Sequence, residues 1–337
     1  MESLNQRVSK GVVWAFLEKF CTTGVSFLVT LVLARLLTPA DYGTVALLAI
    51  FIAIANALAD CGFGQALVQK KDATDVDFNS VFYASVTLSV LLYLVLFVSA
   101  PAIARFYSTW QLVAILRVMS VTLIFNAVNS VQTAELNRGL LFNLSFRINL
   151  IQSASGAIAG ILFAWGGYGP WALVWSQVIG GFGGMLARWF VIKWRPRLMF
   201  SWRSLMGLFS FGWKMTVSTV LNSAMNNLSG ALIGKIYTKA DLAFVEKGQS
   251  LPFTGMSVVN GTVEKVSFPA LSKLQDQSDR VREGMRAMIK CITFLVFPLM
   301  IGCAVCASRL VRLLYGDQWI PAVPYMQVAC FTAALWP

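Results

Sequence analysis

Long apolar runs, separated by charged turns or turns rich in glycine and proline, divide this chain along its whole length. A transmembrane helix needs about 20 predominantly apolar residues, and the pattern predicts ten spans. The runs are longer than the roughly 10 residues of a membrane β-strand and lack strict alternation. We therefore expect an all-α polytopic membrane protein. The expected spans lie near residues 11–33, 43–66, 79–103, 112–133, 147–165, 170–192, 208–233, 248–267, 289–307 and 322–337.

The stretch that ends the first span recurs about 200 residues later. Ala34 to Gly43 aligns with Gly234 to Ala243, so that Thr-x-x-Asp occurs at positions 38–41 and again at 238–241. Further along, the segment 56–60 aligns with 260–264. Ordered matches of this kind predict an internal duplication of about 205 residues, on which many transporter folds are built. The second copy is then expected to be incomplete at residue 337.

Composition supports the membrane assignment, because 57% of the residues are hydrophobic and only 12% are charged, about half the charged share of soluble domains. The net charge of +12 is spread over the loops, so no nucleic-acid partner is expected. Loops on the N-terminal side hold about twice as many Lys and Arg residues as the opposite loops, which predicts a cytoplasmic N-terminus. The chain has no histidine and six scattered cysteines, and no metal site or cofactor is expected.

Four segments resemble the polysaccharide-transporter branch (O-antigen and lipid-linked oligosaccharide flippases) of the multidrug/oligosaccharidyl-lipid/polysaccharide flippase superfamily. They are Leu33–Gly43, Gly62–Gln69, Phe268–Gln275 and Leu314–Trp319. The resemblance implies two pseudo-symmetric six-helix lobes around a central cavity, with residues 1–200 as the N-terminal lobe. Residues 201–337 would form a second lobe with about four spans. It also implies alternating-access transport of undecaprenyl-diphosphate-linked oligosaccharide across the bacterial inner membrane for surface polysaccharide export.

Two polar stripes related by the duplication are candidates for lining the substrate cavity. Side chains four residues apart share one helix face, and the seventh span carries four polar residues at that spacing. Charges at membrane depth normally face a protein interior or water, which favours a cavity role, although helix packing through hydrogen bonds would use similar residues. The predicted cavity residues are Glu18, Lys19, Thr22 and Ser26 on the first span, Lys214, Ser218, Asn222 and Asn226 on the seventh, and Arg147.

Asp60 and Glu264 occupy related positions in the two copies and are candidates for coupling to a proton or sodium gradient. A desolvated carboxylate can be neutralised by either cation, but both residues also suit helix ends at the cytoplasmic interface. Asn126, Asn129 and Gln152 suit hydrogen bonds to sugar hydroxyls or to neighbouring helices. The paired glycines 156/160 and 180/184 predict close helix packing rather than binding.

Two other functions remain open at the level of sequence. An exporter of organic cations would share the duplication, although Lys19 and Lys214 argue against a cationic substrate. A membrane enzyme that processes glycans is less favoured, because the chain has no histidine and no paired acid and base in a long loop. We expect a transporter and not an enzyme, with a lipid-linked oligosaccharide, membrane lipids and glycan polymerase or export machinery as partners.

Overall fold

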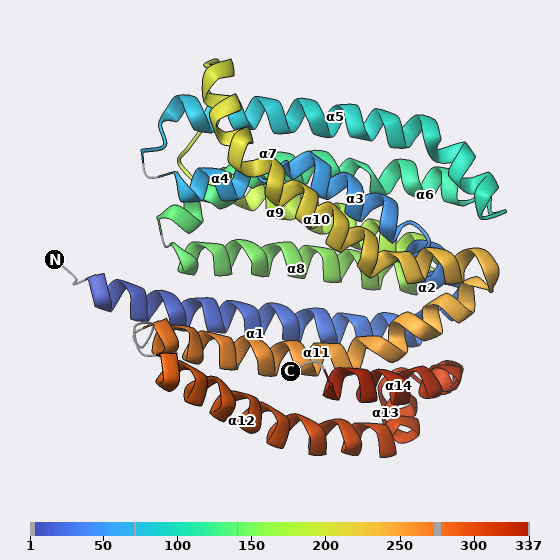
Figure 1. Ribbon diagram of the computed structural model, residues 1–337. Coiled ribbons are helices and arrows are strands. Elements are labelled where there is room, and N and C mark those ends of the chain that lie inside the picture. The colour runs from blue at the N-terminus through green and yellow to red at the C-terminus, as the bar shows by residue number, and fades with distance from the viewer. Residues whose placement is uncertain (1–3, 71, 140, 273–277, 336–337) are drawn as a thin grey trace. The chain divides into compact units, whose positions relative to one another are not determined.

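The computed structural model describes residues 4–70, 72–139, 141–272 and 278–335, and every element in them is helical. Each of the ten predicted spans coincides with one or more helices. The elements are α1 (Leu4–Leu36), α2 (Pro39–Ala46), α3 (Ala49–Asp60), α4 (Phe63–Gln69), α5 (Asp75–Phe106), α6 (Leu112–Met119), α7 (Val121–Arg138), α8 (Phe142–Trp165), α9 (Trp171–Val191), α10 (Trp202–Ile236), α11 (Lys239–Ser272), α12 (Ser278–Val305), α13 (Ala307–Leu314), the 3₁₀ helix η1 (Asp317–Ala322) and α14 (Val323–Ala334) (Figure 1).

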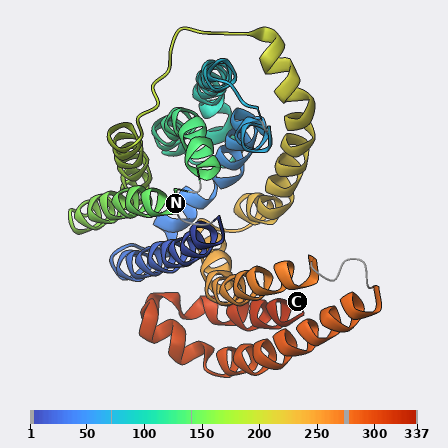
Figure 2. The ribbon, with the colours of Figure 1, turned by 90° about the vertical axis from the view of Figure 1, so that its left-hand side faces the viewer.

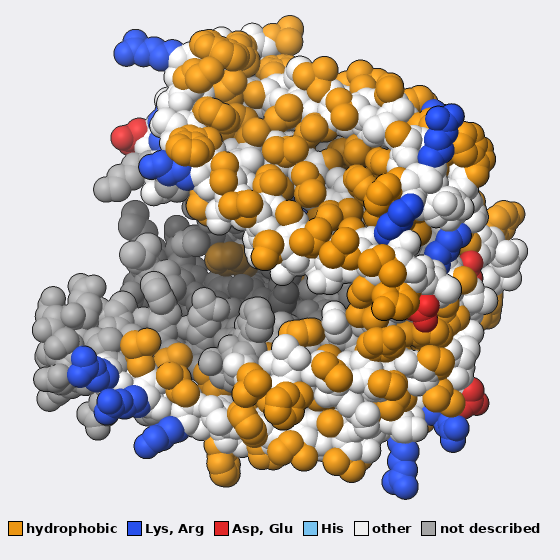
Figure 3. Space-filling model, turned by 45° about the vertical axis from the view of Figure 1, so that its right-hand side comes forward, with side chains coloured by type: hydrophobic (Ala, Val, Ile, Leu, Met, Phe, Trp, Pro, Cys, Tyr) orange, Lys and Arg blue, Asp and Glu red, His pale blue; other side chains and the backbone are white. Residues whose placement is uncertain are grey.

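Five helical segments in the described chain are long and apolar enough to cross a membrane. They are Pro39–Gln69, Asp75–Phe106, Leu112–Arg138, Phe142–Trp165 and Gly284–Val305. Large apolar side chains stay exposed on them, as on α5, where Val98 is 76% exposed. Hydrophobic side chains also dominate the visible face in Figure 3. Lipid contact explains this exposure, since lipid tails are as apolar as leucine.

The repeated Thr-x-x-Asp sequence marks the same break between helices in both copies. α1 ends at Leu36 and α2 begins at Pro39, while α10 ends at Ile236 and α11 begins at Lys239. At the first break Thr38 caps α2: its hydroxyl accepts from the Asp41 backbone N–H, and the Asp41 carboxylate accepts from the Thr38 backbone N–H at 2.9 Å. Such a capping box satisfies two backbone donors at a helix start.

The charged segment from Ser267 to Lys290 reads in the sequence as a connector that forms an interfacial helix. In the structure α11 continues to Ser272 and α12 begins at Ser278, so the described parts of this segment are helical. The first turns of α12 carry basic residues, including Arg282 and Arg286. Arginine, lysine and glutamate have good helix propensity, so such charges do not end a helix.

The chain divides into two compact units, Met1–Lys239 and Ala240–Pro337. The predicted lobe boundary at residue 200 lies before α10, and α10 packs against α3, α4 and α5 within the first unit. In the second unit α12 packs against α14. There Trp319 and Tyr315 are almost fully buried, and the ring of Tyr315 lies near the ammonium of Lys247. The division of the chain into two lobes stays a prediction.

Within the first unit, an extended segment of residues 192–201 carries the chain from α9 to α10 (the crossing segment). Figure 2 shows it passing from α9 on one side of the unit to α10 on the opposite side. Its backbone is held by side chains at the start of α5: the Arg197 N–H donates to Asn79 Oδ1 at 2.5 Å, and the Ser201 N–H donates to Ser80 Oγ at 2.9 Å. Its Trp194 packs against Phe78 and Phe82.

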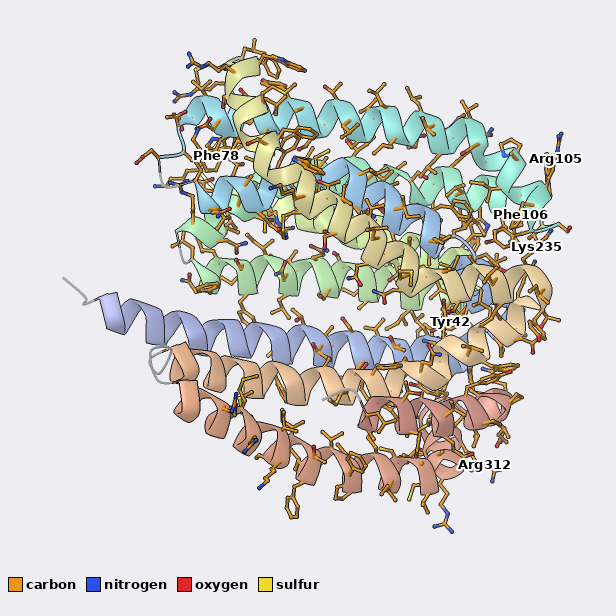
Figure 4. All side chains as sticks on the ribbon, viewed as in Figure 1. Tyr42, Phe78, Arg105, Phe106, Lys235 and Arg312 are labelled. Atoms are coloured by element: carbon orange, nitrogen blue, oxygen red, sulfur yellow. The ribbon has the colours of Figure 1, made fainter. Side chains whose placement is uncertain are left out.

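Asp77, also near the start of α5, joins α5 to the first turn of α10. Its side chain is 2% exposed and accepts hydrogen bonds from the Lys70 ammonium at 2.7 Å, the Thr74 N–H at 2.9 Å and the Ser204 hydroxyl. At the other end of α10, Lys235 donates to the Phe106 carbonyl, and its ammonium lies 4.4 Å from the centre of the Phe106 ring. Figure 4 labels Phe78, which follows Asp77 on α5, and Lys235 near the end of α10. Both ends of α10 are therefore held by residues of other parts of the first unit.

Between these ends, α10 meets the break between α3 and α4 through two glycines. Cys61 and Gly62 have left-handed backbone angles, with φ of 47° and 64°, and the Gly62 backbone lies directly against Gly212. A Cβ atom at Gly212 would lie 2.6 Å from the Cys61 carbonyl oxygen. Only glycine permits this distance between the two backbones.

The first prediction tests the hydrogen bonds to Asp77. Asp77→Ala should lower the free energy of unfolding by about 1–3 kcal/mol, because Lys70, Thr74 and Ser204 lose the buried carboxylate that accepts their hydrogen bonds. Asp75→Ala removes an exposed carboxylate from the same turn and should cost less than about 1 kcal/mol. Thermal unfolding in detergent, followed by tryptophan fluorescence, measures both. Equal losses would show that the buried hydrogen bonds contribute nothing specific.

A second prediction compares two glycines of α10. Gly212→Ala should destabilise the protein by about 1–3 kcal/mol through overpacking. Gly207→Ala, where a Cβ atom would meet nothing within 4 Å, should be neutral or stabilising by up to about 1 kcal/mol, because alanine favours the helix. The same unfolding assay compares them. A harmless Gly212→Ala would contradict the close contact described above.

Candidate functional site

A cavity of about 510 Å³ lies inside the first unit, among α3, α4, α7, α8 and α9. Amide and hydroxyl side chains dominate its lining, together with one carboxylate and one guanidinium. These groups suit hydrogen bonding to a polar ligand. The lining residues are Asp60, Gly64, Gln65, Val68, Gln69, Asn126, Asn129, Ser130, Thr133, Ala134, Asn137, Gln152 and Arg188.

The break after α3 positions one wall of the cavity. Asp60 is the last residue of α3, and the left-handed pair Cys61–Gly62 starts the chain on the new axis of α4. As a result Asp60 stands beside Gly64, where a Cβ atom would lie 3.4 Å from Asp60 Oδ1. Gln65 and Gln69 follow at a four-residue spacing, which places both on one face of α4.

A polar stripe on α7 forms a second wall. Asn126 donates to Asn56 Oδ1 at 2.9 Å and so joins α7 to α3. The hydroxyls of Ser130 and Thr133 donate to the carbonyls of Ala127 and Asn129, at 2.9 and 2.8 Å. Each hydroxyl group thus donates its only hydrogen atom to the backbone, so it is available to a ligand only as an acceptor.

Arg188 supplies the positive charge of the cavity and is 9% exposed. Its guanidinium donates to Gln152 Oε1 at 3.2 Å, to Asn149 Oδ1 at 3.2 Å and to the Gly184 carbonyl at 3.3 Å. Neutral acceptors on α8 and on its own helix thus hold the charge in place. Such partners are necessary, because an unsolvated charge at membrane depth is costly.

Glycines allow α8 and α9 to approach closely enough for these contacts. A Cβ atom at Gly156 would lie 2.8 Å from the Ser176 carbonyl oxygen and 3.4 Å from the Cα of Gly180. The Ser176 hydroxyl donates to the Gly156 carbonyl at 2.8 Å. This confirms the predicted packing role of the paired glycines.

Asn129 has an unused acceptor in the cavity wall. Its side chain is 7% exposed, and no hydrogen bond reaches its Oδ1 atom from the described residues. A buried polar atom without a partner typically costs about 1–3 kcal/mol. Gln132 on the same helix is also buried with both side-chain polar atoms unpartnered in the described chain, but it lies outside the lining.

The predicted site residues fall into two groups. Asp60 lines the cavity, as do Asn126, Asn129 and Gln152, so the structure brings together residues that the sequence places on three different spans. The seventh-span stripe lies elsewhere, with all four side chains exposed on α10 and a hydrogen bond of 3.1 Å from Asn226 to Asn222 Oδ1. Its members are Lys214, Ser218, Asn222 and Asn226.

On α1, Thr22 is half-buried and Ser26 is exposed, while Arg147 is exposed on α8. The side chains of Glu18, Lys19 and Glu264 lie outside the described part of the chain. α1 packs against α8, and α10 packs against α3, α4 and α5. The cavity shared by the two stripes stays a prediction.

Sequence reasoning gave Arg188 no role in a site, because it reads as the first residue of a basic run that ends at Arg203. In the structure Arg188 belongs to α9, which continues to Val191. One signal was present: Arg188 follows Gly184 by four residues in an apolar run, so both lie on the face that packs against α8.

The membrane-length apolar helices define a multi-pass membrane protein. Its fold is shared with solved transporter structures. An inward-facing multidrug resistance MATE family transporter of the MOP superfamily matches 93% of this chain and 84% of its own, with a TM-score of 0.69 and 14% identity. The lipid II flippase MurJ, in an inward closed conformation, matches 96% of this chain and 75% of its own, with a TM-score of 0.73 and 12% identity.

The chain belongs to a family of polysaccharide biosynthesis proteins, whose model matches residues 32–324. The teichuronic acid biosynthesis protein TuaB of Bacillus subtilis is 26% identical over 99% of this chain and 70% of its own length. The lipopolysaccharide biosynthesis protein WzxC of Escherichia coli is 22% identical over 99% of this chain and 68% of its own. The succinoglycan biosynthesis transport protein ExoT of Rhizobium meliloti is 24% identical over 95% of this chain and 65% of its own length.

Proposed function

We propose that this protein is a flippase, which moves a lipid-linked oligosaccharide across the bacterial inner membrane for surface polysaccharide export. The observation that carries the proposal is the family match over residues 32–324, on a chain whose fold is that of membrane transporters. The named relatives act in teichuronic acid, lipopolysaccharide and succinoglycan biosynthesis.

The transport mechanism follows from the duplicated sequence. Two lobes, 1–200 and 201–337, would alternate between access from each side, with the N-terminus in the cytoplasm. An undecaprenyl diphosphate carries negative charge, and the stripe lysines Lys19 and Lys214 would attract it, together with Arg147. The prenyl tail would stay in lipid while the sugars cross in the central cavity expected between the two lobes. Glycan polymerase or export machinery would receive the product.

Asp60 and Glu264 would couple transport to a proton or sodium gradient. Asp60 stands in the wall of the first-unit cavity, at the end of α3. A carboxylate removed from bulk water binds protons or small cations more readily, and cation binding there would change the charge of the cavity.

Gene disruption tests the function directly. A clean deletion should abolish surface glycan while lipid-linked repeat units accumulate inside the cell, because synthesis continues without translocation. Glycan staining of intact cells and mass spectrometry of extracted lipids measure the two pools. Normal surface glycan without a second flippase gene would refute the proposal, and increased sensitivity to cationic dyes alone would indicate an organic-cation exporter.

A charge substitution tests the stripe on α10. Lys214→Ala should reduce surface glycan several-fold by removing positive charge from the path of the diphosphate, and Lys214→Arg should retain part of the activity. Lys193→Ala makes the same charge change at an exposed position of the crossing segment and should have little effect. Thr22→Val should also cost little if Thr22 only joins helices, since one membrane hydrogen bond averages roughly 0.6 kcal/mol. Equal activity of the two lysine-to-alanine variants would remove Lys214 from the site.

A further inference from the structure

The cavity of the first unit has the dimensions of a small-molecule site. Its volume of about 510 Å³ falls within the roughly 300–1,000 Å³ typical of such sites. Six of its lining side chains are amides, each of which offers both donors and an acceptor. They are Gln65, Gln69, Asn126, Asn129, Asn137 and Gln152.

The α7 wall presents acceptors that require donors from a ligand. Asn129 Oδ1 is buried and unpartnered in the described structure, and the hydroxyls of Ser130 and Thr133 already donate to the backbone. Asp60 adds a carboxylate on the adjacent wall. An ionised diphosphate has only acceptors, so it cannot donate to these oxygen atoms, whereas sugar hydroxyls can.

The α7 wall of the cavity is longer than the binding site of a single metal ion. Its polar residues run from Asn126 to Asn137, which corresponds to about 16 Å along a helix at 1.5 Å per residue. A bound cation gathers its oxygen ligands within roughly 2.6 Å. A ligand with hydroxyl groups spread around a ring fits the longer surface better. Arg188, on the opposite helices, offers donors to its oxygen atoms.

We propose that this cavity binds a sugar moiety of the transported glycan, with sugar hydroxyls hydrogen-bonded to the amide side chains of the lining, Asn129 among them. The inference rests on the proposed function and extends it. The glycan would be recognised inside the first unit by its sugars, while the diphosphate is attracted by the lysines of the stripes. The site would therefore help select the glycan that is exported.

Thermal unfolding of the purified protein with free monosaccharides tests the site. Glucose, galactose, N-acetylglucosamine and glucuronate serve as probes, with glycerol as the control for general osmolyte effects. At least one sugar should raise the unfolding midpoint of the wild type by several degrees. Asn129→Leu should lose this shift while unfolding at the same or a higher temperature without sugar, since it removes a buried oxygen atom that has no hydrogen-bond partner among the described residues.

Gln132→Leu is the matched control, because it also removes an unpartnered buried amide from α7, but from outside the cavity lining. It should keep the response to sugar. Two results would overturn the site: no sugar shifts the wild type, or all three proteins respond equally.

Surface glycan separates this inference from the proposed function. If deletion abolishes surface glycan but Asn129→Leu leaves its amount and composition unchanged, the flippase function stands and the sugar site is refuted. If sugars shift the wild type but deletion leaves surface glycan normal, the binding site stands and the flippase function is refuted. Loss of glycan in Asn129→Leu, with Gln132→Leu active, supports both.

Discussion

The hydrogen bonds between the start of α5 and the crossing segment are the constraint on which the first unit depends. An extended segment has no internal backbone partners, so residues 192–201 need side chains that supply them. Asn79 and Ser80 do so, and Asp77 holds Ser204 at the start of α10. These contacts bring α10 to the side of the unit opposite α9. Once α10 lies there, Gly212 packs against the break at Gly62, and this break sets the position of Asp60 in the cavity wall.

Small residues and buried charge are linked on the other side of the cavity. Glycines at the α8–α9 interface bring the two backbones together, and the short distance allows Gln152 and Asn149 to reach the guanidinium of Arg188. A larger residue at Gly184 would displace Gln152, since a Cβ atom there would lie 2.4 Å from its Oε1. Packing and electrostatics therefore cannot be varied independently at this site.

The sequence predicts local features well because they depend on neighbouring residues. Every apolar run is helical in the described residues, and the break at Thr38 follows from the capping box of Thr38 and Asp41, whose sequence pattern recurs at the break near Thr238. Asp60, Asn126, Asn129 and Gln152 were candidates on chemistry alone. Their convergence on one cavity was not predictable, because it depends on the left-handed pair at Cys61 and Gly62 and on contacts between distant segments. Arg188 was missed for the same reason: its partners lie 36 and 39 residues away.

The crossing segment also has a consequence for the order of events during synthesis. Asn79 and Asp77 precede their partners Arg197 and Ser204 by 118 and 127 residues. At roughly 5–20 residues per second, the ribosome needs on the order of 6–25 s to make the intervening chain. During this interval the polar start of α5 has none of these partners and must be solvated by water or lipid headgroups. The first unit can therefore complete its folding only after α10 has begun to emerge from the ribosome. Any factor that protects the nascent chain has to act within that interval.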